Sequence, residues 1–300
     1  MTTATSNSPR TSTSKVECVC CEESFAKHNL YCPKCHAPAE VSSVVAERGA
    51  PPQFISVIGP SGAGKTVYLG MLLDMLSQGK CSLRGLPNGP FSLAVQQETI
   101  RALEQQRFPE KTPSEADQWR WVHCEVAPAK RPKRIVDIVT PDLAGESIAL
   151  ELEHEETYPV IQSVIRKSAG LLVLFDSAQA REDGRTEDIF GMKLVSYLAK
   201  QFRGEGPLRW RRTKVPIAII YTKADSCPEA MEDPEEFAMA TMPGFVQGCE
   251  RHFARHRFFA SGIVGSYAMG VDGYGRRQHM PLHVEPRGII EPLEWLMEQV

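Results

Sequence analysis

A glycine-rich segment with a lysine and a threonine at its end has the composition of a phosphate-binding loop. It reads Gly-Pro-Ser-Gly-Ala-Gly-Lys-Thr over residues 59–66 and fits the pattern G-x-x-x-x-G-K-[ST]. Glycines let successive backbone N–H groups point into one concavity, and a following helix N-terminus adds partial positive charge. Lys65 can reach the β- and γ-phosphates, and the Thr66 hydroxyl can bind Mg²⁺. The residues expected to hold a nucleotide here are Gly59, Ser61, Gly62, Ala63, Gly64, Lys65, Thr66 and Val67.

Two polar segments further along the chain each follow an apolar strand pattern. In Asp142-Leu-Ala-Gly145, the carboxylate can hold Mg²⁺ through water and the glycine N–H can bond a γ-phosphate. In Thr222-Lys223-Ala-Asp225, the carboxylate can accept from both N1–H and the exocyclic N2–H of guanine, a donor pair that adenine lacks. The lysine stem can cover the base. Each segment alone also fits an ordinary turn or a capped helix start, but their order after the phosphate loop favours a guanine-nucleotide site.

The three motifs in this order resemble those of P-loop GTPases of the translation-factor-related (TRAFAC) class, over residues 53–300. The resemblance implies an α/β fold, a three-layer P-loop NTPase or G domain with a mostly parallel sheet. Ala260 and Ser261 then resemble the segment whose backbone contacts the guanine oxygen. The long stretch between Thr66 and Asp142, together with the C-terminal P-R-G-I-I-E-P-L-E-W-L, is similar to the bacterial double-GTPase type, which is associated with conflict or defence gene systems.

The same resemblance implies a Mg²⁺-dependent switch protein that hydrolyses GTP to GDP and phosphate. Glu146 stands where many GTPases carry a glutamine that orients the attacking water, so intrinsic hydrolysis is expected to be slow and stimulated by a partner. Thr112 is the candidate switch threonine, although a plain loop threonine before proline would look the same. The expected catalytic residues are Lys65, Thr112, Gly145 and Glu146, and the expected Mg²⁺ ligands are Thr66, Thr112 and Asp142.

Five of the nine cysteines lie within the first 35 residues, and four of them form two Cys-x-x-Cys pairs separated by ten residues. Two such turns can supply four thiolates to one tetrahedral Zn²⁺, as in a small zinc ribbon. About 25 residues cannot build a core unaided, so the metal would supply folding free energy. Cys20 or His36 could enter the site instead, and reactive thiols or a rubredoxin-type iron centre are alternatives. The expected ligands are Cys18, Cys21, Cys32 and Cys35.

The chain divides into an expected disordered tail over 1–15, a zinc ribbon over 16–39, a linker over 40–52 and a P-loop GTPase domain over 53–300. Short apolar runs alternate with helical patterns in the last part, which favours β-α units. We expect strands at 54–58, 119–126, 134–139, 170–175, 215–221 and 256–260, the second and third as an antiparallel hairpin. We expect helices at 65–78, 93–107, 186–202 and 288–300.

The composition is that of an ordinary globular chain of 300 residues, 42% of them hydrophobic, with a net charge of -3. It excludes a global basic field for nucleic acid, and no apolar run approaches the ~20 residues of a membrane helix. The odd cysteine count and the lack of an apolar signal core favour a cytoplasmic location.

Two other functions remain open: a nucleotide-dependent scaffold without significant hydrolysis, and a zinc-ribbon nucleic-acid-binding protein with a regulatory P-loop domain. Six basic residues around Trp210, within 200–214, could contact nucleic acid, although a solvated loop explains them better. His252 and His256 are spaced by one helical turn and are expected to be surface or interface residues. The favoured partners are a guanine nucleotide and an unidentified protein effector or activator, recruited by the ribbon.

Overall fold

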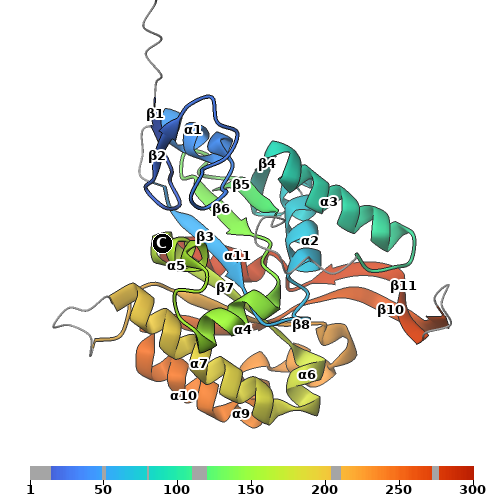
Figure 1. Ribbon diagram of the computed structural model, residues 1–300. Coiled ribbons are helices and arrows are strands. Elements are labelled where there is room, and N and C mark those ends of the chain that lie inside the picture. The colour runs from blue at the N-terminus through green and yellow to red at the C-terminus, as the bar shows by residue number, and fades with distance from the viewer. Residues whose placement is uncertain (1–14, 49–51, 80, 110–119, 204–210, 272–276) are drawn as a thin grey trace, which may run out of the picture.

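The computed structural model describes residues 15–48, 52–79, 81–109, 120–203, 211–271 and 277–300 (Figure 1). The strands are β1 Lys15–Glu17, β2 Ser24–Ala26, β3 Phe54–Ile58, β4 Leu83–Asn88, β5 Trp121–Pro128, β6 Val136–Pro141, β7 Ser168–Asp176, β8 Ile217–Thr222, β9 His256–Ala260, β10 Gly262–Val271 and β11 Arg277–Arg287. The helices are α1 Ala39–Arg48, α2 Lys65–Gln78, α3 Gly89–Glu104, α4 Gly145–Glu153, α5 Pro159–Lys167, α6 Ser177–Glu182, α7 Gly184–Arg203, the 3-10 turn η2 Ala224–Ser226, α8 Pro228–Glu232, α9 Pro234–Thr241, α10 Pro243–His252 and α11 Glu291–Gln299.

The described residues form a seven-stranded central sheet with the order β4-β5-β6-β3-β7-β8-β9. Strand β3 pairs in parallel with both β6 and β7, and β8 and β9 continue the parallel part. Strand β5 runs antiparallel to β4 and to β6. The expected hairpin is therefore confirmed, and so is the expected α/β fold with a mostly parallel sheet.

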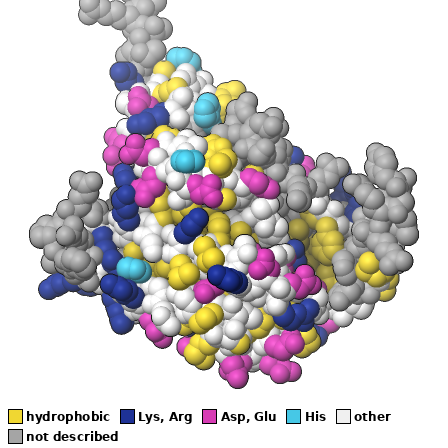
Figure 2. Space-filling view, turned by 60° about the horizontal axis from the view of Figure 1, so that its bottom comes forward, with side chains coloured by type: hydrophobic (Ala, Val, Ile, Leu, Met, Phe, Trp, Pro, Cys, Tyr) yellow, Lys and Arg dark blue, Asp and Glu magenta, His cyan; other side chains and the backbone are white. Residues whose placement is uncertain are grey.

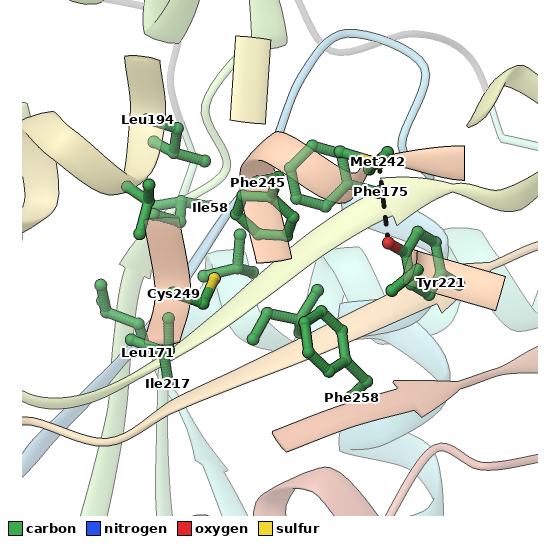
Figure 3. Close-up of a cluster of buried hydrophobic side chains, with 14 of the residues drawn as sticks. Ile58, Leu171, Phe175, Leu194, Ile217, Tyr221, Met242, Phe245, Cys249 and Phe258 are labelled. Carbon is green, nitrogen blue, oxygen red and sulfur yellow. Dashed lines mark hydrogen bonds between the residues drawn. The ribbon is translucent and has the colours of Figure 1, made fainter. Parts of the chain in front are cut away.

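Helices cover both faces of the sheet, because successive side chains of a buried strand point to opposite faces. On β7, Leu171, Val173 and Phe175 enter the core beneath α4 to α10, whereas Leu172 and Leu174 enter the core beneath α2, α3 and α11. Figure 3 shows the first of these cores, where the rings of Phe175, Tyr221, Phe245 and Phe258 converge from three strands and one helix. The Tyr221 hydroxyl contacts the sulfur of Met242 at 3.6 Å.

The expected strands and helices of the GTPase part are present, with boundaries shifted by a few residues. Strand β4, helices α5 and α8 to α10 and the β10–β11 hairpin were not expected. The spacing of His252 and His256 is also not that of one helix, because α10 ends at His252 and His256 opens β9. Among the described residues no helix is long and apolar enough to span a membrane.

The N-terminal hairpin β1–β2 and helix α1 pack against the amino end of β3 and against one face of β5 and β6 (Figure 1). Most of the segment expected as a linker is in fact α1. Val41 and Val45 lie one turn apart and bury their side chains with Phe54 and Trp121 in a shared core. This apolar face stabilises a helix whose serines and valines have weak intrinsic propensity. The domain boundary at residue 52 stays a prediction.

Candidate functional site

The glycine-rich segment forms the turn between β3 and α2. Gly62 and Gly64 have φ values of +78° and +69°, a region that favours glycine. Lys65 is buried, and its Nζ donates to the carbonyl oxygens of Gly59 at 3.1 Å and Pro60 at 2.9 Å. Burial lowers the pKa of Lys65 to about 8, although the nearby carboxylates of Asp142 and Glu146 raise it. A phosphate would supply the negative charge that this buried lysine lacks.

Asp142 follows the carboxyl end of β6, beside the start of α2. The Thr66 hydroxyl donates to its carboxylate, with both oxygens at 3.0 Å. Val67, which was expected at the nucleotide, is the next residue of α2. A threonine hydroxyl and a carboxylate are hard oxygen donors of the kind that Mg²⁺ prefers, so the pair fits this ion. The structure thus brings together two of the three expected Mg²⁺ ligands; the third, Thr112, lies outside the described residues.

The turn that follows Asp142 lies directly against the phosphate loop. An added Cβ on Gly145 would lie 1.9 Å from the Ser61 backbone nitrogen and 2.2 Å from the carbonyl carbon of Pro60, so only glycine fits there. The Ser61 hydroxyl donates to the Glu146 carboxylate at 2.6 Å. Glu146 lies in the first turn of α4, where the helix dipole favours a negative charge. Sequence reasoning missed the Ser61–Glu146 bond, because 85 residues separate the two side chains.

The segment after β8 contacts the same phosphate loop. The Thr222 hydroxyl donates to the carbonyl oxygens of Ala63 at 2.9 Å and of Phe175 at 3.0 Å. Lys223 has a φ of +57°, and its Nζ lies 2.5 Å from the Asp176 carboxylate at the end of β7. These bonds fix the start of the Thr-Lys-x-Asp segment beside the loop that would hold the phosphates.

Asp225 faces the segment that follows β9, as expected for a base-binding corner. The Ala224 N–H donates to the Ser261 carbonyl at 3.0 Å, and the Asp225 carboxylate accepts from the Ile263 N–H at 3.3 Å. Ala260 ends β9 immediately before this contact. A hollow of about 280 Å³ opens beside Asp225, with walls from the β10–β11 hairpin and α8. The hairpin was not foreseen, because apolar and polar residues alternate only weakly along its two strands.

The four expected zinc ligands converge in the ribbon. Their sulfur atoms all lie within 4.8 Å of one another, and the Cys18–Cys35 and Cys21–Cys32 pairs are 3.5 Å apart. Tetrahedral zinc with Zn–S bonds of about 2.3 Å separates its sulfurs by about 3.8 Å, so the donor set fits Zn²⁺. Neither Cys20 nor His36 belongs to this group.

The two cysteine turns have the same backbone geometry. The residues after each second cysteine, Glu22 and His36, have φ values of +64° and +58°. Each donates its N–H to the carbonyl of the first cysteine of its turn, Cys18 at 2.8 Å and Cys32 at 3.0 Å. This repeated turn lets both thiols of a pair point the same way, which is the arrangement a shared metal needs.

A buried charged cluster joins α1 to the sheet. Asp137 is fully buried on β6 and accepts from Arg48 Nη1 at 2.7 Å, from Arg48 Nη2 at 2.9 Å and from His123 Nε2 at 3.0 Å. Arg48 also pairs with Glu125 of β5. Burial alone raises the pKa of Asp137, but the hydrogen bonds from His123 and Arg48 outweigh it and leave the pKa below its ordinary value. The sequence signal was the aspartate inside the apolar strand, since a buried carboxylate needs a partner.

The fold and the site together define a P-loop GTPase: a phosphate loop and an Asp-x-x-Gly turn at the carboxyl edge of a mostly parallel sheet, with a Thr-Lys-x-Asp segment beside them. The family model for Double-GTPase 1 matches residues 56–206, and the chain belongs to this family. It is accordingly a guanine-nucleotide-binding protein of the GTPase class.

No curated protein matches the chain. Among solved structures, the bacterial selenocysteine-specific elongation factor EF-Sec is 14% identical over 70% of this chain, with a TM-score of 0.34. The signal recognition particle receptor complex SRb-GTP/SRX from Chaetomium thermophilum is 14% identical over 72% of this chain and 93% of that chain, with a TM-score of 0.39. The S. cerevisiae Ski7 GTPase-like domain, bound to GDP and inorganic phosphate, is 15% identical over 86% and 52%, with a TM-score of 0.41. The chain spans about a quarter of the elongation factor it matches, 26% of that chain.

Proposed function

We propose that the protein is a Mg²⁺-dependent switch that hydrolyses GTP to GDP and phosphate slowly on its own and faster with a partner. The observation that carries this proposal is the hydrogen bond between Thr66 and Asp142, next to the buried Lys65. The hydroxyl of Thr222 in turn bonds the phosphate loop at Ala63 and so connects it to the proposed base-binding segment. In this proposal, side chains at the carboxyl edge of the sheet bind the phosphates, the metal ion and the base. The resemblance to the double-GTPase type supports, as part of this proposal, a role in a bacterial conflict or defence system.

Each residue has a separate role in this proposal. Lys65 leaves the carbonyls of Gly59 and Pro60 and neutralises the phosphates, together with the N–H groups of residues 59–67. Thr66 and Thr112 would hold Mg²⁺, and Asp142 would support it. When bound, the metal neutralises charge on the β- and γ-phosphates. The Gly145 N–H bonds the γ-phosphate.

The base corner is proposed to select guanine. The Asp225 carboxylate accepts from both N–H donors of the guanine edge, and the Lys223 stem covers the ring. The backbone of Ala260 and Ser261 receives the guanine oxygen. The bond between Ala224 and Ser261 holds this backbone at the correct side of Asp225.

Slow hydrolysis is proposed because Glu146 occupies the position of the water-orienting glutamine. Its carboxylate can accept from a water molecule, yet it brings negative charge toward the anionic γ-phosphate. Small GTPases without a supplied arginine turn over at roughly 10⁻⁴ to 10⁻³ s⁻¹, and an arginine finger adds about 10³ to 10⁵. A partner that neutralises Glu146 or supplies an arginine therefore accelerates the reaction.

The proposal is tested by measuring phosphate release at saturating GTP and Mg²⁺ across a series of protein concentrations, with single-turnover measurements alongside. We expect a slow rate that rises with a partner or on self-association and that is lost in Lys65→Ala. No single-turnover release from a protein that binds GTP identifies a non-hydrolysing scaffold. A concentration-independent rate above ~1 s⁻¹ would show that the chain carries a complete catalytic set, and the partner-dependent switch would be abandoned.

The zinc ribbon is proposed to recruit the protein effector or activator. The exposed side chains of the described ribbon mix acidic, basic and apolar types, among them Glu22, Lys27 and Leu30. Such a surface suits a protein partner better than a phosphate backbone. Lys and Arg gather instead along the left side of Figure 2, which turns the opposite end of the molecule forward. Pull-down with the GTP-locked protein should recover the partner, and ribbon-deleted protein should not. Salt-dependent binding to DNA or RNA would instead support the nucleic-acid alternative.

A further inference from the structure

Two contacts close the Asp-x-x-Gly turn onto the phosphate loop. The first is the close approach of Gly145, whose Cβ position lies 1.9 Å from the Ser61 nitrogen. The second is the hydrogen bond from the Ser61 hydroxyl to the Glu146 carboxylate at 2.6 Å. Ser61 and Glu146 are both exposed, so this bond closes the mouth of the site rather than its floor. The described structure is therefore that of a closed site.

The closed arrangement and a γ-phosphate compete for the same space. A γ-phosphate that accepts from the Gly145 N–H must lie between Gly145 and the phosphate loop, with hydrogen-bond distances of about 3 Å on each side. The direct contact between Gly145 and the Pro60–Ser61 peptide leaves no room for it. Binding of GTP thus requires the turn to move away from the loop, which separates Glu146 from Ser61. Binding of GDP, which has no γ-phosphate, does not require this movement.

We propose that Ser61 and Glu146 form a latch that makes the site prefer GDP over GTP. This inference rests on the proposed function, because it assumes that guanine nucleotides bind at this loop. A ligand that binds only the open form has its apparent affinity reduced by the fraction of molecules that are open. The latch lowers that fraction, so it weakens GTP binding and leaves GDP binding unchanged. The bond also keeps the Glu146 carboxylate at the place that the γ-phosphate approaches.

The test measures the dissociation constants of GDP and of a slowly hydrolysed GTP analogue for full-length protein with Mg²⁺. Ser61→Ala removes the donor and should tighten analogue binding about three- to tenfold, the effect expected for a solvent-exposed hydrogen bond to a charged group. The readout is the ratio of the analogue and GDP dissociation constants, which cancels any common effect of the substitution on the phosphate loop, because Ser61→Ala keeps the backbone N–H groups. The matched control is Ser77→Ala at the far end of α2, where the lost hydroxyl donates to the Asp74 carbonyl; its nucleotide preference should equal that of the wild type.

A double-mutant cycle separates the latch from other effects of the two side chains. Glu146→Ala removes both the latch and the charge that repels the γ-phosphate, so it should tighten analogue binding more than Ser61→Ala. In the Glu146→Ala background, Ser61→Ala should have no further effect. Glu146→Gln keeps an acceptor for Ser61 and loses the charge, so Ser61→Ala should still tighten analogue binding in that background.

The possible results have distinct meanings. An unchanged analogue-to-GDP ratio in Ser61→Ala overturns the latch, and so does an equal effect of Ser61→Ala with and without the Glu146 side chain. If wild-type protein binds neither nucleotide, the proposed function fails and the latch fails with it. Wild-type protein that hydrolyses GTP while both latch tests fail retains the proposed function and loses only this inference.

Discussion

The two ends of strands β3 and β6 are built by different means, although only four residues lie between Asp137 in β6 and Asp142 just after it, a span of about 16 Å. At the carboxyl ends, short turns of defined backbone geometry place Lys65, Thr66 and Asp142 together. At the amino ends, a small metal-binding module is joined to the sheet by side chains, above all by Arg48.

The two regions therefore differ in what keeps them folded. The phosphate loop is held by the large cores on both faces of the sheet, so its shape does not depend on a ligand for support. The ribbon shares only a small core with the sheet, and its four thiols need a metal to stay together. Substitutions that unfold the ribbon should therefore leave nucleotide binding largely unchanged. Substitutions in the phosphate loop should leave the ribbon folded.

The largest expected effect is that of zinc removal. We predict one Zn²⁺ per chain, and Cys32→Ser with Cys35→Ser should unfold the ribbon, since structural zinc sites supply about 10–16 kcal/mol of binding free energy. GTP affinity should remain nearly intact, because the two large cores of the sheet, rather than the core shared with the ribbon, support the phosphate loop. Elemental analysis and nucleotide titration measure both effects.

Cys20→Ala is the matched control for the zinc prediction. Cys20 is buried in the same ribbon but lies outside the four-sulfur group, so its loss should leave the zinc content at one per chain. Freshly purified wild-type protein without stoichiometric zinc would contradict the prediction. Loss of GTP binding together with zinc would show that the two ends are coupled.

The next largest effect should come from Asp137→Asn at the junction between ribbon and sheet. Removing one partner of a buried ion pair costs about 3–5 kcal/mol, and here both Arg48 and His123 lose the charged group they contact. The depressed pKa of Asp137 gives the sign of the pH effect. Its contribution is present above the unfolded-state value of about 4 and is lost as the pH falls through the folded-state pKa.

Urea unfolding of the zinc-loaded protein measures this loss. Glu98→Gln is the control, because it breaks an ion pair with Arg120 that is exposed on both sides and should cost at most about 1 kcal/mol. Equal losses in the two variants would contradict a structural role for Asp137. If Asp137→Asn also changes GTP affinity, the ion pair at Asp137 and the nucleotide site at Asp142 are energetically coupled.

The sequence predicted most of the carboxyl edge and little of the amino junction. The phosphate loop and the cysteine turns are local patterns, and Asp142 and Asp225 were found because each belongs to a short motif that follows a strand, although 76 positions separate Thr66 from Asp142. Arg48 and Asp137 are 89 residues apart, and the segment containing Arg48 has weak helix propensity. The pairings Ser61–Glu146 and Asp225–Ile263 are likewise set by chain packing over long separations. The type of a residue shows that it needs a hydrogen-bond or ion-pair partner, but it does not show which distant residue that partner is.

A smaller effect is expected for Asp225→Asn at the base corner. An amide cannot accept from both guanine donors, and a buried unpaired donor costs ~1–3 kcal/mol, or roughly one to two decades in affinity. Competition between GTP and ATP measures the preference. Asp233→Asn, which changes a carboxylate that caps α9, is the control and should keep the guanine preference. Wild-type protein that binds ATP as tightly as GTP would show that the guanine assignment is wrong.

The smallest expected effect is a pH dependence of nucleotide affinity at the carboxyl edge. Burial lowers the pKa of Lys65 to about 8 in the nucleotide-free protein, and bound phosphates should raise it again. Above pH 8 the free protein has lost this proton, so binding must take it up and affinity falls as the pH rises. Between pH 7 and pH 9 GDP affinity should fall about tenfold, which corresponds to one pKa unit or about 1.4 kcal/mol. Lys65→Arg keeps its charge over this range and should give a flatter profile, even if it binds more weakly. A flat wild-type profile would show that Lys65 stays charged without phosphate, whereas a slope that is lost in Lys65→Arg would assign the pH dependence to this lysine.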